Sequence, residues 1–380
     1  MPRIAVDAMG ADGAPRVEVE GVISAVRSEQ TFVILVGDER RLRHELEEQG
    51  AAGHANIEVR HAPEVITMDD PPSMAVKQKK KSSMRICFDL VKAGEADAAV
   101  SAGNSGAMMA CGLFVLGRLP GVERPAIVTT FPTKLGECAL LDMGANVDPK
   151  PAVMAQWAVL GAVYARLLHG KARPRVGLLS NGSEEHKGTQ LTRGTHQLLA
   201  RSHNLNRPTA PMAWQSGDVP GPAGDIEGDF QYVGCIEGRD VFRGEIDVVV
   251  TDGFTGNVVL KSVEGAAEVI MSMVREEIER AGPLARLGAA LMLKPLRRLK
   301  RRTDYAEYGG APLLGVNGVA LICHGGSNAR AIKNAIRVAG DFARSRLGDE
   351  STAAVARNAF LWEPAATPAP LAPVKAEAIP

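Results

Sequence analysis

The chain has 380 residues, and its 44 Lys and Arg balance 44 Asp and Glu, so the formal net charge is zero. This length allows one large domain or two of ordinary size, with a core that needs no disulfide or metal to fold. The neutral balance excludes a globally basic nucleic-acid-binding protein, and any electrostatic partner must be attracted by a local patch.

Short apolar runs alternate with longer helical patterns along the chain. The runs predict strands at 3–7, 32–37, 57–61, 97–103, 126–131, 138–142, 175–180, 247–253 and 318–325. Helices are predicted at 15–29, 38–49, 73–93, 105–118, 150–169, 186–202, 255–281 and 327–346. Continuous apolar strands separated by helices indicate an α/β fold, doubly wound, with a largely parallel sheet and helices on both faces.

Three segments depart from this alternation. Residues 207–229 contain four prolines and four glycines and predict a loop insertion. Residues 351–380 follow a single domain of 1–350, and we expect them to be a Pro/Ala-rich disordered tail. The third segment, 282–302, combines leucines with a dense run of cations.

The sequence is typical of a cytoplasmic protein. Its five cysteines lie far apart, without CxxC spacing, as reduced core cysteines do. A strand is predicted almost at once, and the N-terminus lacks the pattern of a secretory signal. The most apolar long stretch, 152–168, is interrupted by Gln156 and Arg166, so no membrane span is predicted.

Six predicted strands end in glycine-rich loops, in the segments VDAMG, VSAGNSG, LLDMGAN, LLSNGSEEHKG, VVTDGFTGN and LICHGGSN. In an open parallel sheet the ligand lies outside the carboxyl ends of the strands, so we expect these loops to share one cleft. The residues Gly103, Asn104, Ser105 and Gly106 predict a nest of N–H groups for an anion. A plain strand-to-helix turn capped by Ser105 is the alternative.

Two loops carry the clearest candidates for chemistry. Lys187 is a candidate for a cation that points into the cleft, and the alternative is a lysine exposed to solvent. His186 could act as an acid, a base or a hydrogen-bond donor, and the alternative is a surface histidine without a role. The Asn257 amide is placed to donate to a carbonyl or phosphate oxygen, with helix capping as the alternative. Asp252 leaves its strand in the same loop, with capping of the next helix as the alternative. Similar positions are held by residues that also commonly tie loops together: Asp7, Asp142 and Asn146.

Several common kinds of site are not indicated. The loops fit neither GxxxxGK[ST] nor GxGxxG, so no nucleotide cofactor is predicted. There is no GxSxG elbow and no HxxxH or His/Cys cluster, so we predict neither an enzyme nucleophile nor a metal. If the cleft performs acyl transfer, the nucleophile arrives as a substrate.

Over about residues 2–346 the chain resembles the bacterial phosphate acyltransferases of phospholipid synthesis. The resemblance rests on IAVDAMGADGAP, KKKSSMRICFDLVKAGEADAAVSAGNSGAMMA, LLDMGANVDPKP, LLSNGSEEHKG, VVTDGFTGNVVLKSVEG and YGGAPLLGVNGVALICHGGSN. It implies an α/β/α sandwich similar to isocitrate and isopropylmalate dehydrogenases. It also implies a homodimer that transfers a fatty acyl group from acyl-carrier protein to inorganic phosphate without a nicotinamide cofactor, and we expect no other cofactor.

On that resemblance, Lys187 and Asn257 match positions important for catalysis, while His186 stands where the family varies. Bound phosphate is expected to attack the thioester directly, with Lys187 holding the phosphate and Asn257 polarising the carbonyl. The residues expected to bind phosphate or substrate are Asp7, Gly103, Asn104, Ser105, Gly106, Asp142, Asn146, Ser183, Asp252, Gly253 and Gly256.

Two basic patches predict macromolecular partners. The first is suited to docking the acidic carrier protein, unless it is only a solvated helix face, and comprises Lys77, Lys79, Lys80, Lys81 and Arg85. The second, 282–302, predicts peripheral binding to an anionic membrane surface, with a dimer-packing helix as the alternative. Its key residues are Leu284, Leu287, Leu291, Arg297, Arg298, Arg301 and Arg302.

Three other functions remain open from the sequence. The same cleft would suit a phosphotransacetylase acting on short-chain acyl-CoA, although the basic leucine-rich segment speaks against it. A metal-dependent decarboxylating dehydrogenase would need clustered aspartates and a nucleotide site. A non-catalytic membrane-bound phosphate or lipid sensor belongs to a different class. The expected location is the cytoplasm, at the inner face of the cell membrane.

Overall fold

The structure is a computed structural model that describes residues 1–184, 186–203, 229–292, 294 and 309–363. Most of the predicted insertion 207–229 lies outside the described residues. So do the membrane-segment arginines Arg297, Arg298, Arg301 and Arg302.

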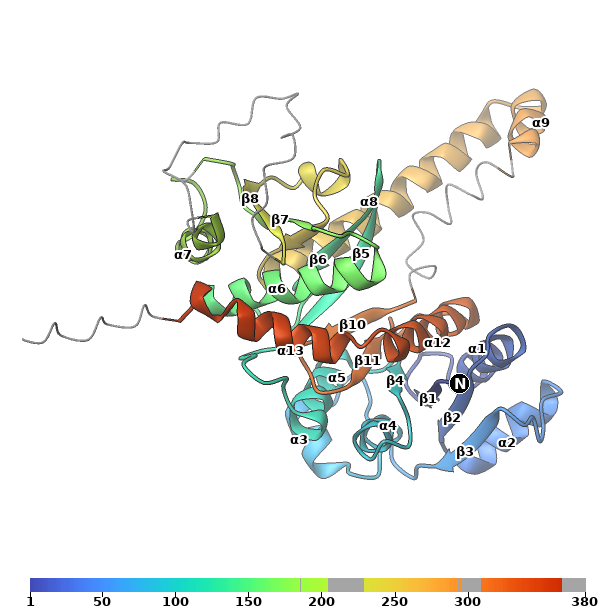
Figure 1. The fold of residues 1–380 in the computed structure, drawn as a ribbon. Helices are drawn as coiled ribbons and strands as arrows, with labels where there is room; N and C mark the ends of the chain where they lie inside the picture. The colour runs from blue at the N-terminus through green and yellow to red at the C-terminus, as the bar shows by residue number, and fades with distance from the viewer. Residues whose placement is uncertain (185, 204–228, 293, 295–308, 364–380) are drawn as a thin grey trace, which may run out of the picture.

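Within these ranges, eleven strands form one sheet in the order β3-β2-β1-β4-β11-β10-β5-β6-β9-β7-β8 (Figure 1). The strands are β1 (Arg3–Asp7), β2 (Phe32–Gly37), β3 (Ile57–His61), β4 (Ala98–Ser101), β5 (Ala126–Thr133), β6 (Gly136–Leu141), β7 (Arg175–Leu179), β8 (Gln231–Ile236), β9 (Val248–Val250), β10 (Ala311–Leu314) and β11 (Val319–Ile322). All nine predicted strands are present, and β8 and β10 are additional.

Helices cover both faces of the sheet, which confirms the predicted α/β class. The side chains of Ile4 and Val6 join a core with α1 (Arg16–Ser28), α6 (Pro151–Leu168) and α12 (Ala329–Arg344). The intervening Ala5 joins the opposite core with α4 (Ser83–Lys92) and α5 (Ser105–Cys111). The alternation follows from the two-residue period of a strand. Among the described residues the remaining α-helices are α2 (Glu39–Glu48), α3 (Pro72–Gln78), α7 (Gln190–Ala200), α8 (Gly253–Arg280), α9 (Pro283–Leu291) and α13 (Leu347–Arg357).

The strands of the two halves of the sheet run in opposite directions. β1, β2, β3, β4 and β11 are mutually parallel, and so are β6, β9, β7 and β8. Between them β10 is antiparallel to β11 and β5, and β5 is antiparallel to β6. The carboxyl ends of β1, β4 and β11 therefore lie at one edge of the sheet, and those of β6, β7 and β9 lie at the other.

Helix α6 is long and apolar enough by length and composition to span a membrane, but 72% of it is buried inside the fold. Trp157 is fully buried and donates from Nε1 to the Arg124 carbonyl at 2.9 Å. Gln156, which interrupts the apolar run, bonds the backbone of Gly121 and Glu123. These contacts are those of a core helix.

The expectation that residues 351–380 form a disordered tail is wrong for their first part. Helix α13 runs to Arg357, and a 3-10 turn follows at Ala359–Leu361. Val355 and Leu361 are almost fully buried in the core shared with α6. Because these apolar side chains pack into the core, the fold continues beyond residue 350 to Glu363. Residues 364–380 lie outside the described residues.

Candidate active site

The loops after β1, β4 and β11 interlock at one edge of the sheet, and we call them the first loop group. Asp7 is buried, and its carboxylate accepts from Ser101 Oγ at 2.7 Å and from the Met9 N–H at 3.1 Å. Burial raises the pKa of Asp7 above its usual value, and these hydrogen bonds oppose that rise. A Cβ at residue 10 would lie 2.7 Å from the Gly103 nitrogen, so Gly10 permits the two loops to meet.

Asn104 serves as an anchor within this group. Its Nδ2 donates to the carbonyl oxygens of Thr67, Met68 and Asp70, and its Oδ1 accepts from the Ala107 N–H. Gly106 lies against Pro72, with no room for a side chain. The amide of Asn104 is thus committed to tying the 67–72 segment to the start of α5, and Ser105 is the exposed residue of the predicted nest.

The loops after β6, β7 and β9 form a second loop group at the opposite edge. Its centre is Asp142, which is fully buried and accepts from the N–H groups of Ile127, Ala145 and Asn146 and from Asn146 Nδ2. Burial raises the pKa of Asp142, and these donors oppose that rise. Asn146 also donates to the Pro125 carbonyl at 2.8 Å. The Asp142 carboxylate and the Asn146 Nδ2 group are thus engaged in holding the loop together.

The start of α8 is locked against this centre. Asp252 caps the helix by accepting from the Thr255 N–H at 2.8 Å, so it too is committed. A Cβ at residue 253 would lie 2.7 Å from the Asn146 carbonyl oxygen, and one at residue 256 would overlap the Asp142 carbonyl oxygen. The two glycines are therefore required for the close approach.

This lock places Asn257 with its side chain exposed at the rim of the second loop group. A Cβ at Gly144, whose φ is +111°, would lie 3.6 Å from Asn257 Cβ and 3.8 Å from its Oδ1. The side chain therefore stands over the loop that follows β6. Because Asp252 already caps α8, the Asn257 amide is not needed for capping and is available to a ligand.

The loop after β7 brings Lys187 to the same edge. β7 and β9 are adjacent parallel strands, with Leu178 paired to Val250, so their following loops leave the sheet side by side. The Lys187 side chain is 41% exposed, and its Nζ lies 3.5 Å from Glu184 Oε1. His186 and Ser183 are exposed in the same loop.

The expectation that all six loops share one cleft is wrong within a single chain. Lys187, His186, Ser183 and Asn257 all follow strands whose carboxyl ends lie at the edge of the second loop group. The first loop group, with Asp7 and residues 103–106, lies at the other edge. The reason is the reversal of strand direction at β10 and β5, which turns the carboxyl ends of β6, β7 and β9 away from those of β1, β4 and β11.

The four buried cysteines, Cys87, Cys111, Cys138 and Cys323, are not suited to covalent catalysis. None of these four forms a disulfide, and burial raises the pKa of Cys111, Cys138 and Cys323 to about 12. Burial also raises the pKa of Cys87 well above its usual value. A thiol with so high a pKa carries almost no thiolate at neutral pH, so these four groups are poor nucleophiles.

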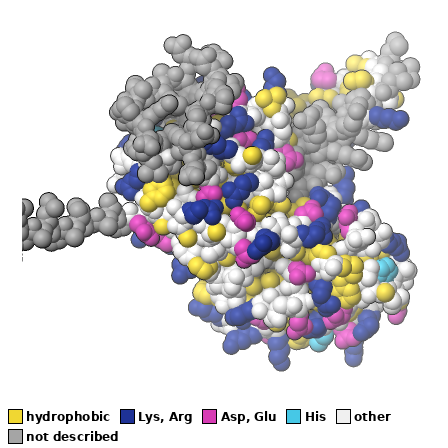
Figure 2. Space-filling view, viewed as in Figure 1, with side chains coloured by type: hydrophobic (Ala, Val, Ile, Leu, Met, Phe, Trp, Pro, Cys, Tyr) yellow, Lys and Arg dark blue, Asp and Glu magenta, His cyan; other side chains and the backbone are white. Residues whose placement is uncertain are grey.

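Of the five basic residues predicted to dock the carrier protein, two form ion pairs within the chain and three are exposed. Lys79 Nζ pairs with Asp70 and donates to the Val65 carbonyl, and Arg85 pairs with Asp89 at 3.2 Å. Lys77, Lys80 and Lys81 are exposed. Lys77 Nζ lies 5.2 Å from the ring centroid of Phe114, a residue that is 54% exposed. Lys and Arg side chains line the lower edge of Figure 2, where α3 and α4 lie in Figure 1.

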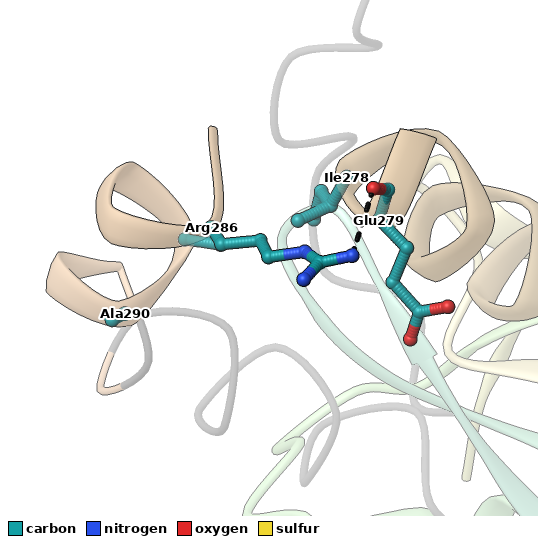
Figure 3. A pocket seen from close by; sticks show the side chains of 5 residues that line it. Ile278, Glu279, Arg286 and Ala290 are labelled. Carbon is teal, nitrogen blue, oxygen red and sulfur yellow. Dashed lines mark hydrogen bonds between the residues drawn. The ribbon is translucent and has the colours of Figure 1, made fainter. Parts of the chain in front are cut away.

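A hollow of about 510 Å³ lies between the end of α8 and α9. Arg286 of α9 reaches across to donate to the Glu279 carbonyl at 3.2 Å (Figure 3). Ile278 in its wall is 21 residues beyond Asn257 on the same helix, about 30 Å away at the α-helical rise. The hollow therefore lies between α8 and α9 and is separate from the second loop group. Leu284, Leu287 and Leu291 also lie on α9.

Two acidic residues of the loop groups, Glu184 and Glu18, were not predicted as site residues from the sequence. Glu184 forms an ion pair with Lys187. An acidic residue three positions before a lysine is the sequence pattern that indicates this ion pair. Glu18 lies on α1, fully buried, and accepts from the Ala11 N–H of the first loop group at 2.9 Å. Its signal is an acid in the first helical turn after a glycine-rich loop.

Comparison with known proteins identifies relatives over almost the whole chain. A family described as "Fatty acid synthesis protein" matches residues 2–207 and 224–348. A phosphate acyltransferase of Geobacter sulfurreducens is 51% identical over 342 residues, 90% of this chain and 91% of that protein. A phosphate acyltransferase of Pelobacter propionicus is 49% identical over 356 residues, 94% of this chain and 95% of that protein.

Solved structures share the fold at low identity. A phosphotransacetylase from Streptococcus pyogenes superposes with a TM-score of 0.58 at 17% identity, covering 90% of this chain and 94% of that one. The EutD phosphotransacetylase from Staphylococcus aureus gives a TM-score of 0.53 at 17% identity, with the same coverage.

Proposed function

Because the chain belongs to the phosphate acyltransferase family and is an acyltransferase, we propose that it transfers a long-chain fatty acyl group from acyl-carrier protein to inorganic phosphate. The reaction is reversible, and its product is acyl phosphate for phospholipid synthesis. The observation that carries this proposal is the second loop group, where Lys187 and Asn257 emerge from adjacent strands over a rigid scaffold.

The residues have distinct tasks in this reaction. Lys187 holds the phosphate dianion by charge, and a phosphate oxygen attacks the thioester carbonyl carbon. Asn257 donates its amide N–H to the oxyanion that develops on the carbonyl oxygen. When the tetrahedral intermediate collapses, the C–S bond breaks and the electron pair leaves with the carrier thiolate, which then takes a proton from solvent.

The high pKa values of the buried cysteines support direct attack over an acyl-enzyme. Positioning two reactants together supplies most of the rate enhancement in such a mechanism. Trapping an acyl group on a protein side chain during turnover would contradict it.

Exposed lysines and an aromatic ring support docking of the carrier protein on α3. We propose that Lys77, Lys80 and Lys81 attract the acidic carrier, with Phe114 as an apolar contact beside them. Raising the salt concentration is expected to weaken carrier binding, because exposed charges are screened. Carrier binding that does not weaken at high salt would show that these lysines do not contact the carrier protein.

A homodimer would cover the outer part of α8. This helix projects from the body of the molecule (Figure 1), and Val269, Ile270 and Met273 are 56%, 58% and 60% exposed. A two-fold contact along α8 would bury these side chains and stiffen the helix that begins at the reaction site. Sedimentation equilibrium tests this part of the proposal, and a monomer at micromolar concentration would contradict it.

We further propose that the protein is cytoplasmic and binds reversibly to the inner face of the membrane through 282–302. Its cations would be attracted to anionic lipid, each contributing about 1 kcal/mol near the surface. Changing Arg297, Arg298, Arg301 and Arg302 to glutamate is expected to abolish sedimentation with anionic vesicles. Unchanged sedimentation would contradict membrane binding through this segment.

One assay distinguishes the candidate activities. The protein is incubated with a long-chain acyl-carrier protein or with acyl-CoA, with and without phosphate, and thiol release is followed. Phosphate-dependent release from the carrier supports the proposal, whereas a preference for short-chain acyl-CoA would indicate a phosphotransacetylase. No release from either donor would contradict both candidate activities.

A further inference from the structure

The candidate phosphate-binding cation already has an anionic partner in its own loop. Lys187 Nζ lies 3.5 Å from Glu184 Oε1, and the Lys187 N–H donates to the Glu184 carbonyl at 3.0 Å. The carboxylate therefore occupies a position beside the ammonium group that an oxyanion of a ligand would also take.

The surrounding turn holds the two side chains in place. A Cβ at residue 182 would lie 2.7 Å from Glu184 Oε2 and 3.0 Å from Lys187 Cδ, so both side chains lie over Gly182. The Gly188 N–H donates to Asn181 Oδ1 at 2.8 Å, and Arg193 donates to the Gly188 carbonyl at 2.7 Å. The turn is closed at its base, while the two charged groups remain partly exposed, at 41% for Lys187 and 52% for Glu184.

The pair is charged and easy to open. Its own backbone N–H lowers the pKa of Glu184, and the charge of Lys187 lowers it further, so the carboxylate is ionised at neutral pH. An exposed ion pair contributes little free energy, because water competes for both groups. An incoming dianion can replace the carboxylate without disturbing the closed base of the turn.

We infer that Glu184 occupies the place beside Lys187 that phosphate takes, and that it competes with phosphate for this lysine. Phosphate binding then requires the Glu184 carboxylate to leave Lys187 and turn to solvent. This inference rests on the proposed function, since it assigns orthophosphate to Lys187. It predicts that the affinity for phosphate is limited by a group within the site.

The test is phosphate binding measured by titration calorimetry without an acyl donor. Glu184→Gln is expected to bind phosphate about fivefold more tightly, which corresponds to the loss of one exposed ion pair. Glu184→Asp keeps the charge but shortens the reach to Lys187, so it should also tighten binding. Glu237→Gln is the matched control, because Glu237 follows β8 at the same edge and pairs with Arg239 at 3.2 Å.

A double-mutant cycle separates the effect of the Glu184–Lys187 ion pair on phosphate affinity from the effect of removing a negative charge near the site. In a Lys187→Met background, Glu184→Gln should change phosphate affinity by less than about twofold. In turnover, Glu184→Gln should lower KM for phosphate without raising kcat. A purely structural role would instead lower kcat and thermal stability together.

The outcomes separate the inference from the proposed function. Unchanged or weaker phosphate binding by Glu184→Gln would overturn the inference while leaving thiol release by the wild-type protein intact. Tighter binding by Glu184→Gln alone, with Glu184→Asp unchanged, would indicate long-range repulsion and would also overturn it. A wild-type protein that neither binds phosphate nor releases thiol would refute both.

Discussion

Asn257 stands over Gly144, with its Cβ 3.6 Å from the position that a Gly144 Cβ would occupy. The contact joins the first turns of α8 to the loop after β6, two segments separated by more than 100 residues. It exists because Gly253 and Gly256 let α8 begin in contact with the backbone around Asp142. The candidate oxyanion donor is therefore fixed by the scaffold and not by a flexible loop.

Replacing Asn257 by alanine should lower kcat about a hundredfold, or about 3 kcal/mol, the usual loss for one preorganised oxyanion donor. The KM for phosphate should change little, because the amide acts on the acyl carbonyl. Steady-state thiol release measures both constants. Ser262→Ala, an exposed change farther along α8, is the control, and an equal loss in that variant would argue against a role for the amide.

Asp142→Asn tests the scaffold beneath this site. The substitution replaces one acceptor oxygen by an amide donor that faces the N–H groups of Ile127, Ala145 or Asn146. A buried N–H left without an acceptor costs roughly 1–3 kcal/mol, so the free energy of unfolding should fall by about that amount. Urea denaturation measures it. Asp148→Asn, on the exposed part of the same loop, should leave stability within about 0.5 kcal/mol of wild type.

The elements were predictable because their patterns are local. Each of the nine apolar runs became a strand, and the predicted helices formed near their expected bounds, although 73–93 is divided into α3 and α4. The strands β8 and β10 were missed for local reasons as well. β10 is only Ala311–Leu314 and contains a proline, which weakens the strand signal.

The division of the site was not predicted, although one signal for it was present. The predicted strands 126–131 and 138–142 are separated by six residues, too few for the crossover that parallel strands need. They form the antiparallel pair β5 and β6, and this reversal sends Asp142 to the edge opposite Asp7. The direction in which β10 enters the sheet depends on contacts with β11 and β5 that no local pattern encodes.

Asp229 should anchor the last helix. Its carboxylate accepts from Arg357 at 2.8 Å, Asn358 at 2.7 Å and Arg166 of α6 at 3.1 Å. Burial works to raise the pKa of Asp229, but these hydrogen bonds outweigh it and the pKa lies below the usual value. Asp229→Ala should lower the free energy of unfolding by about 2 kcal/mol, because partly buried donors lose their acceptor.

The stabilisation from Asp229 should be present at neutral pH and lost as pH falls through its depressed pKa. Thermal unfolding at pH 7 and pH 3 measures this, and the variant should differ from wild type less at pH 3. Asp349→Ala is the control, since Asp349 is 75% exposed on α13 and pairs only with Arg346 among the described residues. Equal losses in the two variants would contradict an anchoring role.

Glu18 should make the stability of the protein fall as pH rises. Its Oε1 accepts from the Ala11 N–H, and its Oε2 is buried without a hydrogen-bond partner among the described residues. Burial, with a smaller effect from the Asp7 charge, raises the pKa of Glu18 from 4.5 to about 7. Between these two values the folded protein keeps a proton that the unfolded chain has released, so the free energy of unfolding falls with increasing pH and levels off above about 7.

Glu18→Gln removes this titration and keeps an oxygen for the Ala11 N–H. Its free energy of unfolding relative to wild type should therefore rise between pH 5 and pH 8 by about 2–3 kcal/mol, because one pKa unit corresponds to about 1.4 kcal/mol. Urea denaturation across this range provides the measurement, with the exposed Glu20→Gln on the same helix as control. Parallel pH profiles for wild type and Glu18→Gln would show that Glu18 is ionised in the folded protein.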